Sequence, residues 1–161
     1  MKLYLVRHGE AVGETVHPER PLSERGREDS KIMGMILKSQ QVTITHVWHS
    51  GKKRAIETAE IIADILGIRN LCEQRAGLHP NDPVQDTARE IKTMGAADDG
   101  EAIMIVGHIP FLPRLASVLL TGKDNLGFIR FETAGVACLD SFQGGDWQIE
   151  QVLTPRSLPL E

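Results

Sequence analysis

The sequence predicts an α/β fold, a three-layer α/β/α sandwich around a mostly parallel mixed sheet. Two short apolar runs, residues 3–6 and 102–106, are nearly continuous, which is typical of parallel strands covered on both faces. Segments with apolar residues at helical spacing separate the predicted strands. Further strand-like segments follow the last of these helices, and they predict an antiparallel portion of the sheet at the C-terminal end.

The first half of the chain alternates strand and helix. The first strand is expected at Lys2–Val6, and the first helix extends from an N-cap at Ser23 to about Lys38. A short strand is expected at Thr45–His49. Ser50 is the N-cap candidate of the helix that follows.

The second half continues this alternation and then changes to strands alone. An edge strand is expected at Asn70–Glu73, and a helix around residues 84–91. The strand Ala102–Val106 precedes a helix that begins near Pro110, a residue suited to the first turn. The remaining expected elements are three strands, one turn and an irregular tail: Phe128–Phe131, Val136–Ser141, Trp147–Val152, the turn Gly144-Gly145-Asp146, and Pro155–Glu161.

Length and composition fit a single globular domain over residues 1–161, with 41% hydrophobic and 25% charged residues. The net charge of -4 and the aromatic content of 4% argue against a nucleic-acid partner. No apolar stretch approaches the roughly 20 residues that cross a membrane. The first apolar run stops at Arg7, too early for a signal peptide. Cys72 and Cys138 lack metal or redox spacing, so we expect free thiols and a cytoplasmic protein. We also expect a monomer without a membrane partner.

A histidine follows each of the two apolar runs. The first run ends on Arg7-His8-Gly9 and the second on Gly107-His108. Ligands of open α/β sheets bind beyond the carboxyl ends of the strands, so the two imidazoles should meet in one crevice if the strands are neighbours. A nucleophilic base beside a fixed guanidinium suits phosphoryl chemistry. Gly9 would let the backbone turn sharply and a ligand approach closely.

A basic segment, Ser50–Ala55, follows the second predicted strand and opens a helix. Backbone N–H groups at a helix N-terminus favour anions, and Arg54 in the first turn could bind two phosphate oxygens. Lys52 and Lys53 are explained more simply as a solvated basic face. The sequence therefore places a second candidate phosphate ligand, Arg54, at the same edge of the sheet as His8.

Four motifs occur in order along nearly the whole chain: Val6–Glu10, Pro21–Gly26, Ser50 with Arg54-Ala55 and Thr58-Ala59, and Val106–Pro110. Together they resemble the histidine phosphatase superfamily, the phosphoglycerate-mutase-like proteins, and within it the short bacterial phosphohistidine phosphatases of the SixA type. The resemblance implies that His8 accepts the phosphoryl group, that Arg7 and Arg54 hold it, and that His108 completes the pocket.

The same resemblance implies a wider set of residues around the phosphate. Gly9, Ser50 and Gly107 are expected to bind substrate together with Arg7 and Arg54. His108 is expected to hydrogen-bond the phosphoryl group as a cation, although sequence alone does not determine its protonation state. The guanidinium groups supply the positive charge, so we expect no metal and no other cofactor.

The chain departs from the family pattern at two places. Many relatives have proline after the serine of the third motif, where this chain has Gly51, and we expect a looser helix start. Relatives that cleave phosphate esters often have a glutamate general acid near the segment Leu78-His79-Pro80, where this chain has none. An imidazole leaving group depends less on a strong acid than an alkoxide does. The remaining proton-donor candidates are His79, Asp82 and Glu10, with Glu14 and His17 in the same loop as Glu10.

The function expected from these features is removal of phosphate from a histidine-phosphorylated signalling protein, such as the phosphotransfer domain of a sensor kinase. From Arg54 to His108 the chain advances only 54 positions, where larger family members insert helices that cover the site. Two alternatives stay open: a phosphatase of small phosphate monoesters, and a non-catalytic module that binds phosphorylated partners. The intact set of His8, Arg7, Arg54 and His108 argues against the module, and mutase activity is the least favoured.

Overall fold

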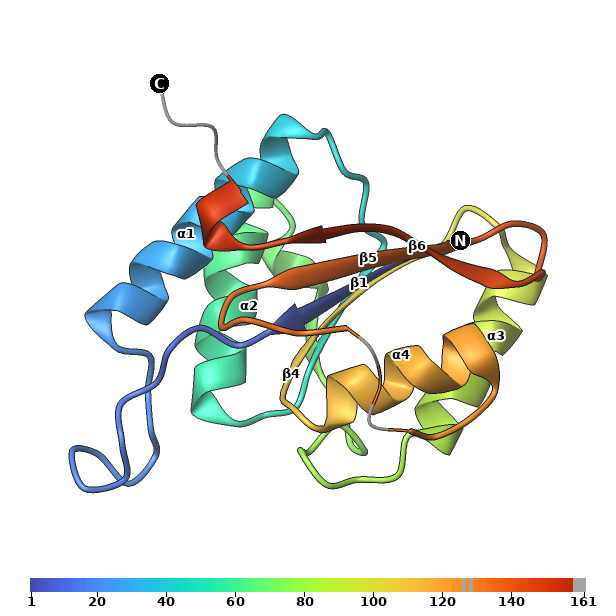
Figure 1. The fold of residues 1–161 in the computed structure, drawn as a ribbon. Coiled ribbons are helices and arrows are strands. Elements are labelled where there is room, and N and C mark those ends of the chain that lie inside the picture. The colour runs from blue at the N-terminus through green and yellow to red at the C-terminus, as the bar shows by residue number, and fades with distance from the viewer. Residues whose placement is uncertain (126, 128, 158–161) are drawn as a thin grey trace.

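The computed structural model describes residues 1–125, 127 and 129–157, and within them one mixed sheet lies between two pairs of helices (Figure 1). The sheet order is β3-β2-β4-β1-β5-β6. The strands are β1 (Lys2–Arg7), β2 (His46–His49), β3 (Cys72–Gln74), β4 (Ala102–Gly107), β5 (Val136–Ser141) and β6 (Trp147–Leu153). The helices are α1 (Glu24–Ser39), α2 (Lys53–Leu66), α3 (Gln85–Ala97) and α4 (Phe111–Thr121). The predicted α/β/α sandwich is confirmed.

The order of the strands follows from the helical connections. Strands β1 to β4 are mutually parallel, whereas β5 is antiparallel to β1 and β6 to β5. Helices α1 and α2 carry the chain outward from β1 to β3 on one face. Helices α3 and α4 cover the other face, along the path from β3 back to β4 and on to β5. The face changes because crossovers are right-handed, and the chain here crosses the sheet in the opposite direction. Strands β1 and β4 are therefore neighbours at the switch point, where open sheets bind ligands.

Alternate side chains of each central strand enter opposite cores. Leu3 and Leu5 pack on the side of α3 and α4, whereas Tyr4 and Val6 pack on the side of α1 and α2. Strand β4 is buried along its whole length, which explains its unbroken apolar run. The two cores fix β1 and β4 rigidly, and with them the residues at their carboxyl ends.

The predicted element boundaries are largely confirmed. The Ser23 hydroxyl accepts a hydrogen bond from the Gly26 N–H and caps α1, as expected. Strand β3 begins at Cys72, slightly later than the predicted edge strand. Cys72 and Cys138 are both unpaired thiols. No helix in the described part of the chain is both long and apolar enough to span a bilayer.

Three predictions for the C-terminal portion need correction. Residues 129–131 form no strand, and Phe128 lies outside the described residues. Ile129 and Phe131 bury their side chains in the core without pairing their backbone in the sheet. The hairpin turn lies one residue earlier than predicted, at Gln143 and Gly144, both with positive φ. The predicted irregular tail begins with a 3₁₀ turn at 155–157, and residues 158–161 lie outside the described set.

Candidate active site

The two predicted histidines lie side by side at the carboxyl ends of β1 and β4. Arg7 is in register with Gly107, and the His8 N–H donates to the Gly107 carbonyl over 3.0 Å. The ring centroids of His8 and His108 are 5.1 Å apart, with an angle of 54° between the ring planes. The sheet register therefore places both imidazoles in the same crevice.

The His8 ring is held by its own loop. Its Nδ1 lies 2.7 Å from the Gly9 carbonyl oxygen, which can only accept a hydrogen bond. The proton of the neutral ring is thus assigned to Nδ1, and Nε2 keeps a free electron pair. This tautomer leaves Nε2 as the basic atom of the ring.

Glycine is required after His8 because helix α1 approaches the backbone closely. A Cβ on Gly9 would lie 2.7 Å from the Gly26 carbonyl oxygen and 2.9 Å from the Ser30 hydroxyl. The Gly9 N–H donates to the Thr58 hydroxyl (2.9 Å), which in turn donates to the Arg54 carbonyl (2.8 Å). Gly9 therefore joins the His8 loop to both α1 and α2, a packing role beyond the expected approach of a ligand.

Both predicted phosphate-binding arginines carry a buried N–H group without a partner. Arg7 donates from Nη1 to the Phe131 carbonyl over 2.9 Å, but its Nε has no hydrogen-bond partner among the described residues. Arg54, in the first turn of α2, likewise has a buried and unpartnered Nε. Unpartnered buried donors are rare in folded proteins. Two guanidinium groups with such donors fit an oxyanion better than an apolar ligand.

Ser50 positions His108 and does not cap α2 as predicted. Its Oγ lies 2.7 Å from His108 Nε2, and it accepts a 3.3 Å hydrogen bond from the Lys52 N–H. The N-cap residue of α2 is Lys52, which makes no side-chain cap. With the Ser50 hydroxyl as the donor to Nε2, the neutral His108 ring carries its proton on Nδ1; with the hydroxyl as the acceptor, the proton is on Nε2. That Nδ1 is buried and has no partner in the described protein.

The electrostatic environment keeps both imidazoles neutral at pH 7. Burial, together with the charges of Arg54, Arg7 and Arg20, lowers the pKa of His8 to about 4. Burial and, to a smaller extent, the charges of His8 and Arg54 together lower the pKa of His108 to about 3. The protein groups therefore favour a neutral His108, in contrast to the expected cation. Only the negative charge of a phosphoryl group between the rings would raise its pKa.

The proton-donor candidates occupy different positions. His79 and Asp82 line a hollow of about 380 Å³ beside Ser50, and the His79 N–H donates to the Asp82 carboxylate over 2.9 Å. Glu10 is held elsewhere, because its carboxylate accepts a 3.0 Å hydrogen bond from the Ser23 hydroxyl at the start of α1. Glu14 lies in a groove on the other side, near Arg54. Among His79, Asp82 and Glu10, the first two are better placed to give a proton to a leaving group, because their hollow is also lined by Ser50.

One residue of the site escaped prediction from sequence. Arg20 lies in the loop before α1, and its charge lowers the pKa of both His8 and Arg54. Its backbone has a φ of +50°, and its Nε donates to the Val12 carbonyl over 3.1 Å. No periodic pattern marks a loop residue of this kind, so only the basic residue itself could have drawn attention. In the described residues, no three His, Cys, Asp or Glu side chains are grouped to hold a metal ion.

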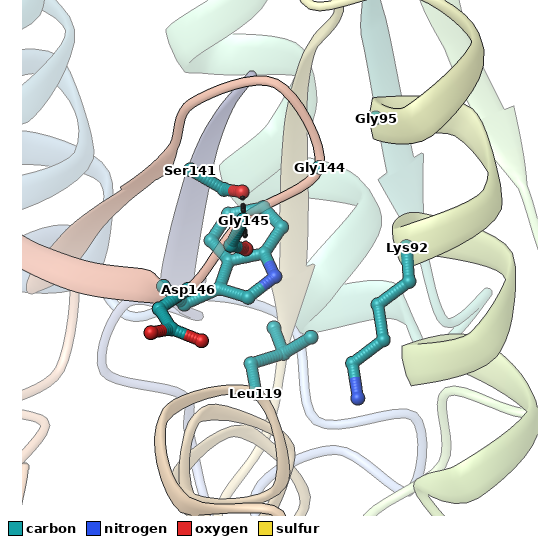
Figure 2. A pocket seen from close by; sticks show the side chains of 8 residues that line it. Lys92, Gly95, Leu119, Ser141, Gly144, Gly145 and Asp146 are labelled. Atoms are coloured by element: carbon teal, nitrogen blue, oxygen red, sulfur yellow. Dashed lines mark hydrogen bonds between the residues drawn. The ribbon is translucent and has the colours of Figure 1, made fainter.

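A separate hollow of about 280 Å³ lies at the opposite end of the sheet (Figure 2). Trp147 and Leu119 form part of its wall, with the charged groups of Lys92 and Asp146 at its rim. The Ser141 hydroxyl donates to the Gly145 carbonyl over 2.8 Å. None of the predicted site residues lines this hollow.

Known proteins are similar to this chain in sequence and in fold. The family model described as "Histidine phosphatase superfamily (branch 1)" matches residues 3–79. Phosphohistidine phosphatase SixA of Escherichia coli K12 is 28% identical over 152 residues, 92% of this chain and 93% of that protein. The structure of the protein histidine phosphatase SixA complexed with tungstate has a TM-score of 0.87 at 24% identity, over 99% of this chain and 100% of that chain. Phosphoglycerate mutase from Bacillus anthracis has a TM-score of 0.71 at 20% identity, over 93% and 91% of the two chains.

The six-stranded arrangement and its histidine–arginine crevice define a phosphoglycerate-mutase-like α/β protein. The matched N-terminal motifs and the full-length similarity to a phosphohistidine phosphatase extend this assignment. The chain is thus similar to the histidine phosphatase superfamily in its N-terminal half, and to SixA over nearly its whole length.

Proposed function

We propose that the protein is a phosphohistidine phosphatase that acts on a histidine-phosphorylated signalling protein, such as a phosphotransfer domain. The observation that carries the proposal is the crevice itself. The ring centroids of two neutral imidazoles lie 5.1 Å apart, and the buried Nε–H groups of Arg7 and Arg54 have no partner in the described protein, nor has Nδ1 of His108. Full-length similarity to SixA supports the same substrate class.

The first chemical step transfers the phosphoryl group to His8. The electron pair of His8 Nε2 attacks phosphorus, and the bond between phosphorus and the substrate nitrogen breaks in line. Arg7 and Arg54 stabilise the charge on the equatorial oxygens, and His108 Nδ1–H donates to one of them. The leaving imidazole takes its proton from His79 or from solvent in the adjoining hollow.

The second step restores the enzyme. Water attacks the phosphorus of phosphorylated His8, the bond to Nε2 breaks, and inorganic phosphate leaves with the proton that water loses. Where His79 gave its proton in the first step, it regains one from solvent. The guanidinium groups supply positive charge in both steps, so the proposed mechanism requires no metal.

An open site supports a protein substrate. The segment 54–108 is described throughout, and its helices α2 and α3 pack on the two faces of the sheet (Figure 1). His79 and Gln74 at the rim are exposed. A phosphohistidine carried on a helix surface could therefore reach His8. We further propose a cytoplasmic monomer, consistent with two free thiols.

The test is phosphate release from a histidine-phosphorylated phosphotransfer domain, beside a panel of sugar and aryl phosphate esters. We expect rapid release from the protein and slow hydrolysis of the esters, with trapped phosphate on His8 after rapid acid-free quenching. Rapid ester hydrolysis without release from the phosphoprotein would instead assign a phosphatase of small monoesters. Tight binding of the phosphoprotein without turnover would assign a binding module.

A further inference from the structure

A groove of about 730 Å³ lies beside the catalytic crevice, between the loop before α1 and the N-terminal half of α2. It is much larger than one phosphoryl group. Arg54 lines the groove and is also one of the two arginines expected to hold the phosphoryl group, so the groove adjoins the phosphoryl-binding position. The other lining residues are Glu14, Pro18, Glu19, Arg20, Gly51, Lys52, Lys53, Ile56, Glu57 and Glu60.

Most of the acidic side chains in this groove are already compensated. Glu57 accepts a hydrogen bond from the Leu22 N–H (2.9 Å) and forms an ion pair with Arg27. The remaining two pairs are Glu60 with Arg69 at 2.5 Å and Glu19 with Lys53 at 3.6 Å. Only the Glu14 carboxylate has no ion pair among the described residues.

The basic side chains are not compensated to the same extent. Arg20, Lys52 and Arg54 form no ion pair with any described residue, whereas Lys53 does. The Arg20 side chain is fixed at its Nε by the Val12 carbonyl, which leaves both Nη groups free to bind an anion. The groove therefore presents three uncompensated cations against one carboxylate.

Arg20 and Lys52 also lie close enough to influence the two catalytic rings. The Arg20 charge lowers the pKa of His8, and the Lys52 charge lowers that of His108. The phosphoryl group itself already has the donors of Arg7, Arg54 and His108. The further cations are thus available to a different anionic group next to the phosphohistidine.

We propose that Arg20 and Lys52 form a second anion subsite that binds an acidic side chain flanking the phosphohistidine of the protein substrate. The proposal rests on the proposed function, because it assumes that the phosphoryl group arrives on a polypeptide. A carboxylate in this subsite would form charge-assisted hydrogen bonds with the guanidinium and the ammonium group. The subsite would thereby select among phosphohistidine segments by their acidic neighbours.

The experiment uses a set of phosphohistidine peptides that carry one glutamate at each of the three positions on either side of the phosphohistidine. Each has a matched peptide with glutamine in its place. At least one glutamate peptide should exceed its glutamine partner in kcat/KM by about three- to tenfold at low salt, the range for a partly exposed charge-assisted contact. This preference should fall at about 1 M salt, where the Debye length is only about 3 Å.

Three variants locate the preference. Arg20→Gln and Lys52→Gln should each remove most of it, chiefly through KM. Lys53→Gln is the matched control, because Lys53 lines the same groove but is paired with Glu19; it should keep the wild-type preference. Equal turnover of all matched pairs by the wild-type protein would overturn the subsite while leaving the proposed function intact. Equal losses on both members of a pair would show that Arg20 and Lys52 act on the phosphoryl group. No turnover of any peptide would overturn the proposed function itself.

Discussion

The two ends of the sheet each contain a hollow, but they differ in the hydrogen bonding of their buried polar groups. At the amino end of β1, the N-terminal amine donates to the Asp99 carboxylate (3.0 Å) and to the Ser141 carbonyl (2.7 Å). The Ser141 hydroxyl is likewise satisfied by the Gly145 carbonyl (Figure 2). At the carboxyl end, buried donors of Arg7, Arg54 and His108 lack partners in the described protein.

This difference shows which feature marks a reactive site. Both ends have depth and charge, yet among the described residues the unpaired buried nitrogens of arginine and histidine side chains all lie at the carboxyl end; one further unpaired donor, the Trp48 indole N–H, belongs to the hydrophobic core. Such donors cost stability unless something else supplies the acceptor. The carboxyl end is thus organised for an anion, whereas the amino end is organised for folding. Substitutions at the two ends should consequently affect different properties.

The largest effect should come from His8→Ala. Loss of Nε2 removes the nucleophile, and we expect phosphate release to fall by at least about 1,000-fold. The half-buried ring lies at the rim of the core, so the melting temperature should change little. Steady-state assays with circular dichroism would measure both. Turnover at the wild-type rate would exclude His8 as the phospho-acceptor.

Arg54→Lys should have the next largest effect. Lysine keeps the positive charge but cannot place two N–H groups on one phosphoryl group, so kcat should fall by roughly 100-fold. Vanadate or tungstate affinity, measured by inhibition, should weaken in parallel. Lys53→Arg, at the position directly before Arg54, is a suitable control because Lys53 is already paired with Glu19. Wild-type kinetics for Arg54→Lys would remove Arg54 from the phosphate clamp.

The pH profile tests the neutral imidazoles. Protonation of His8 Nε2 abolishes its electron pair, so kcat/KM should fall about tenfold per pH unit below the His8 pKa of about 4. The unfolded chain has a histidine pKa near 6.5, so between about pH 4 and 6.5 it binds more protons than the native protein. The free energy of unfolding should therefore rise with pH across this window. An acid limb near pH 6.5 would contradict the burial of His8.

The smallest effects should come from two separate serine-to-alanine variants, one at each end of the sheet. Ser50→Ala removes the partner of His108 Nε2, and we expect roughly tenfold lower kcat/KM with a shifted pH profile. Ser141→Ala removes the contact with Gly145 and should lower the free energy of unfolding by about 1 kcal/mol, with activity unchanged. If Ser141→Ala reduced turnover as much as Ser50→Ala, the division between the two ends would fail.

The sequence predicted the central part of the fold and site because local signals there agree with the tertiary structure. Continuous apolar runs identified β1 and β4, and the residues that follow them, His8 and His108, do lie together. The sheet order was not predictable, since it depends on which face each crossover helix covers. Arg20 was missed because a loop residue acquires its position from tertiary contacts such as that with Val12.

Ser50 and the segment before β5 show why some local signals mislead. A serine just before a helix predicts an N-cap, but the imidazole of His108, distant in sequence, competes for the same hydroxyl. Apolar residues at 129–131 predicted a strand because their side chains are buried, yet the Phe131 carbonyl is bonded to Arg7. In both cases a side chain distant in sequence contacts a polar group that the local pattern had assigned to secondary structure.

The backbone at Gly51 has a consequence for the evolution of this chain. Gly51 has a φ of +85°, and a Cβ there would lie 2.5 Å from the Gln74 amide. Proline, with its φ fixed near −65°, cannot replace it in this conformation. The Gln74 amide is the end of an exposed, flexible side chain that can turn aside, so the backbone at Gly51 is the stronger barrier. The serine–proline pair of many relatives is therefore accessible to this chain only with a different backbone path between β2 and α2.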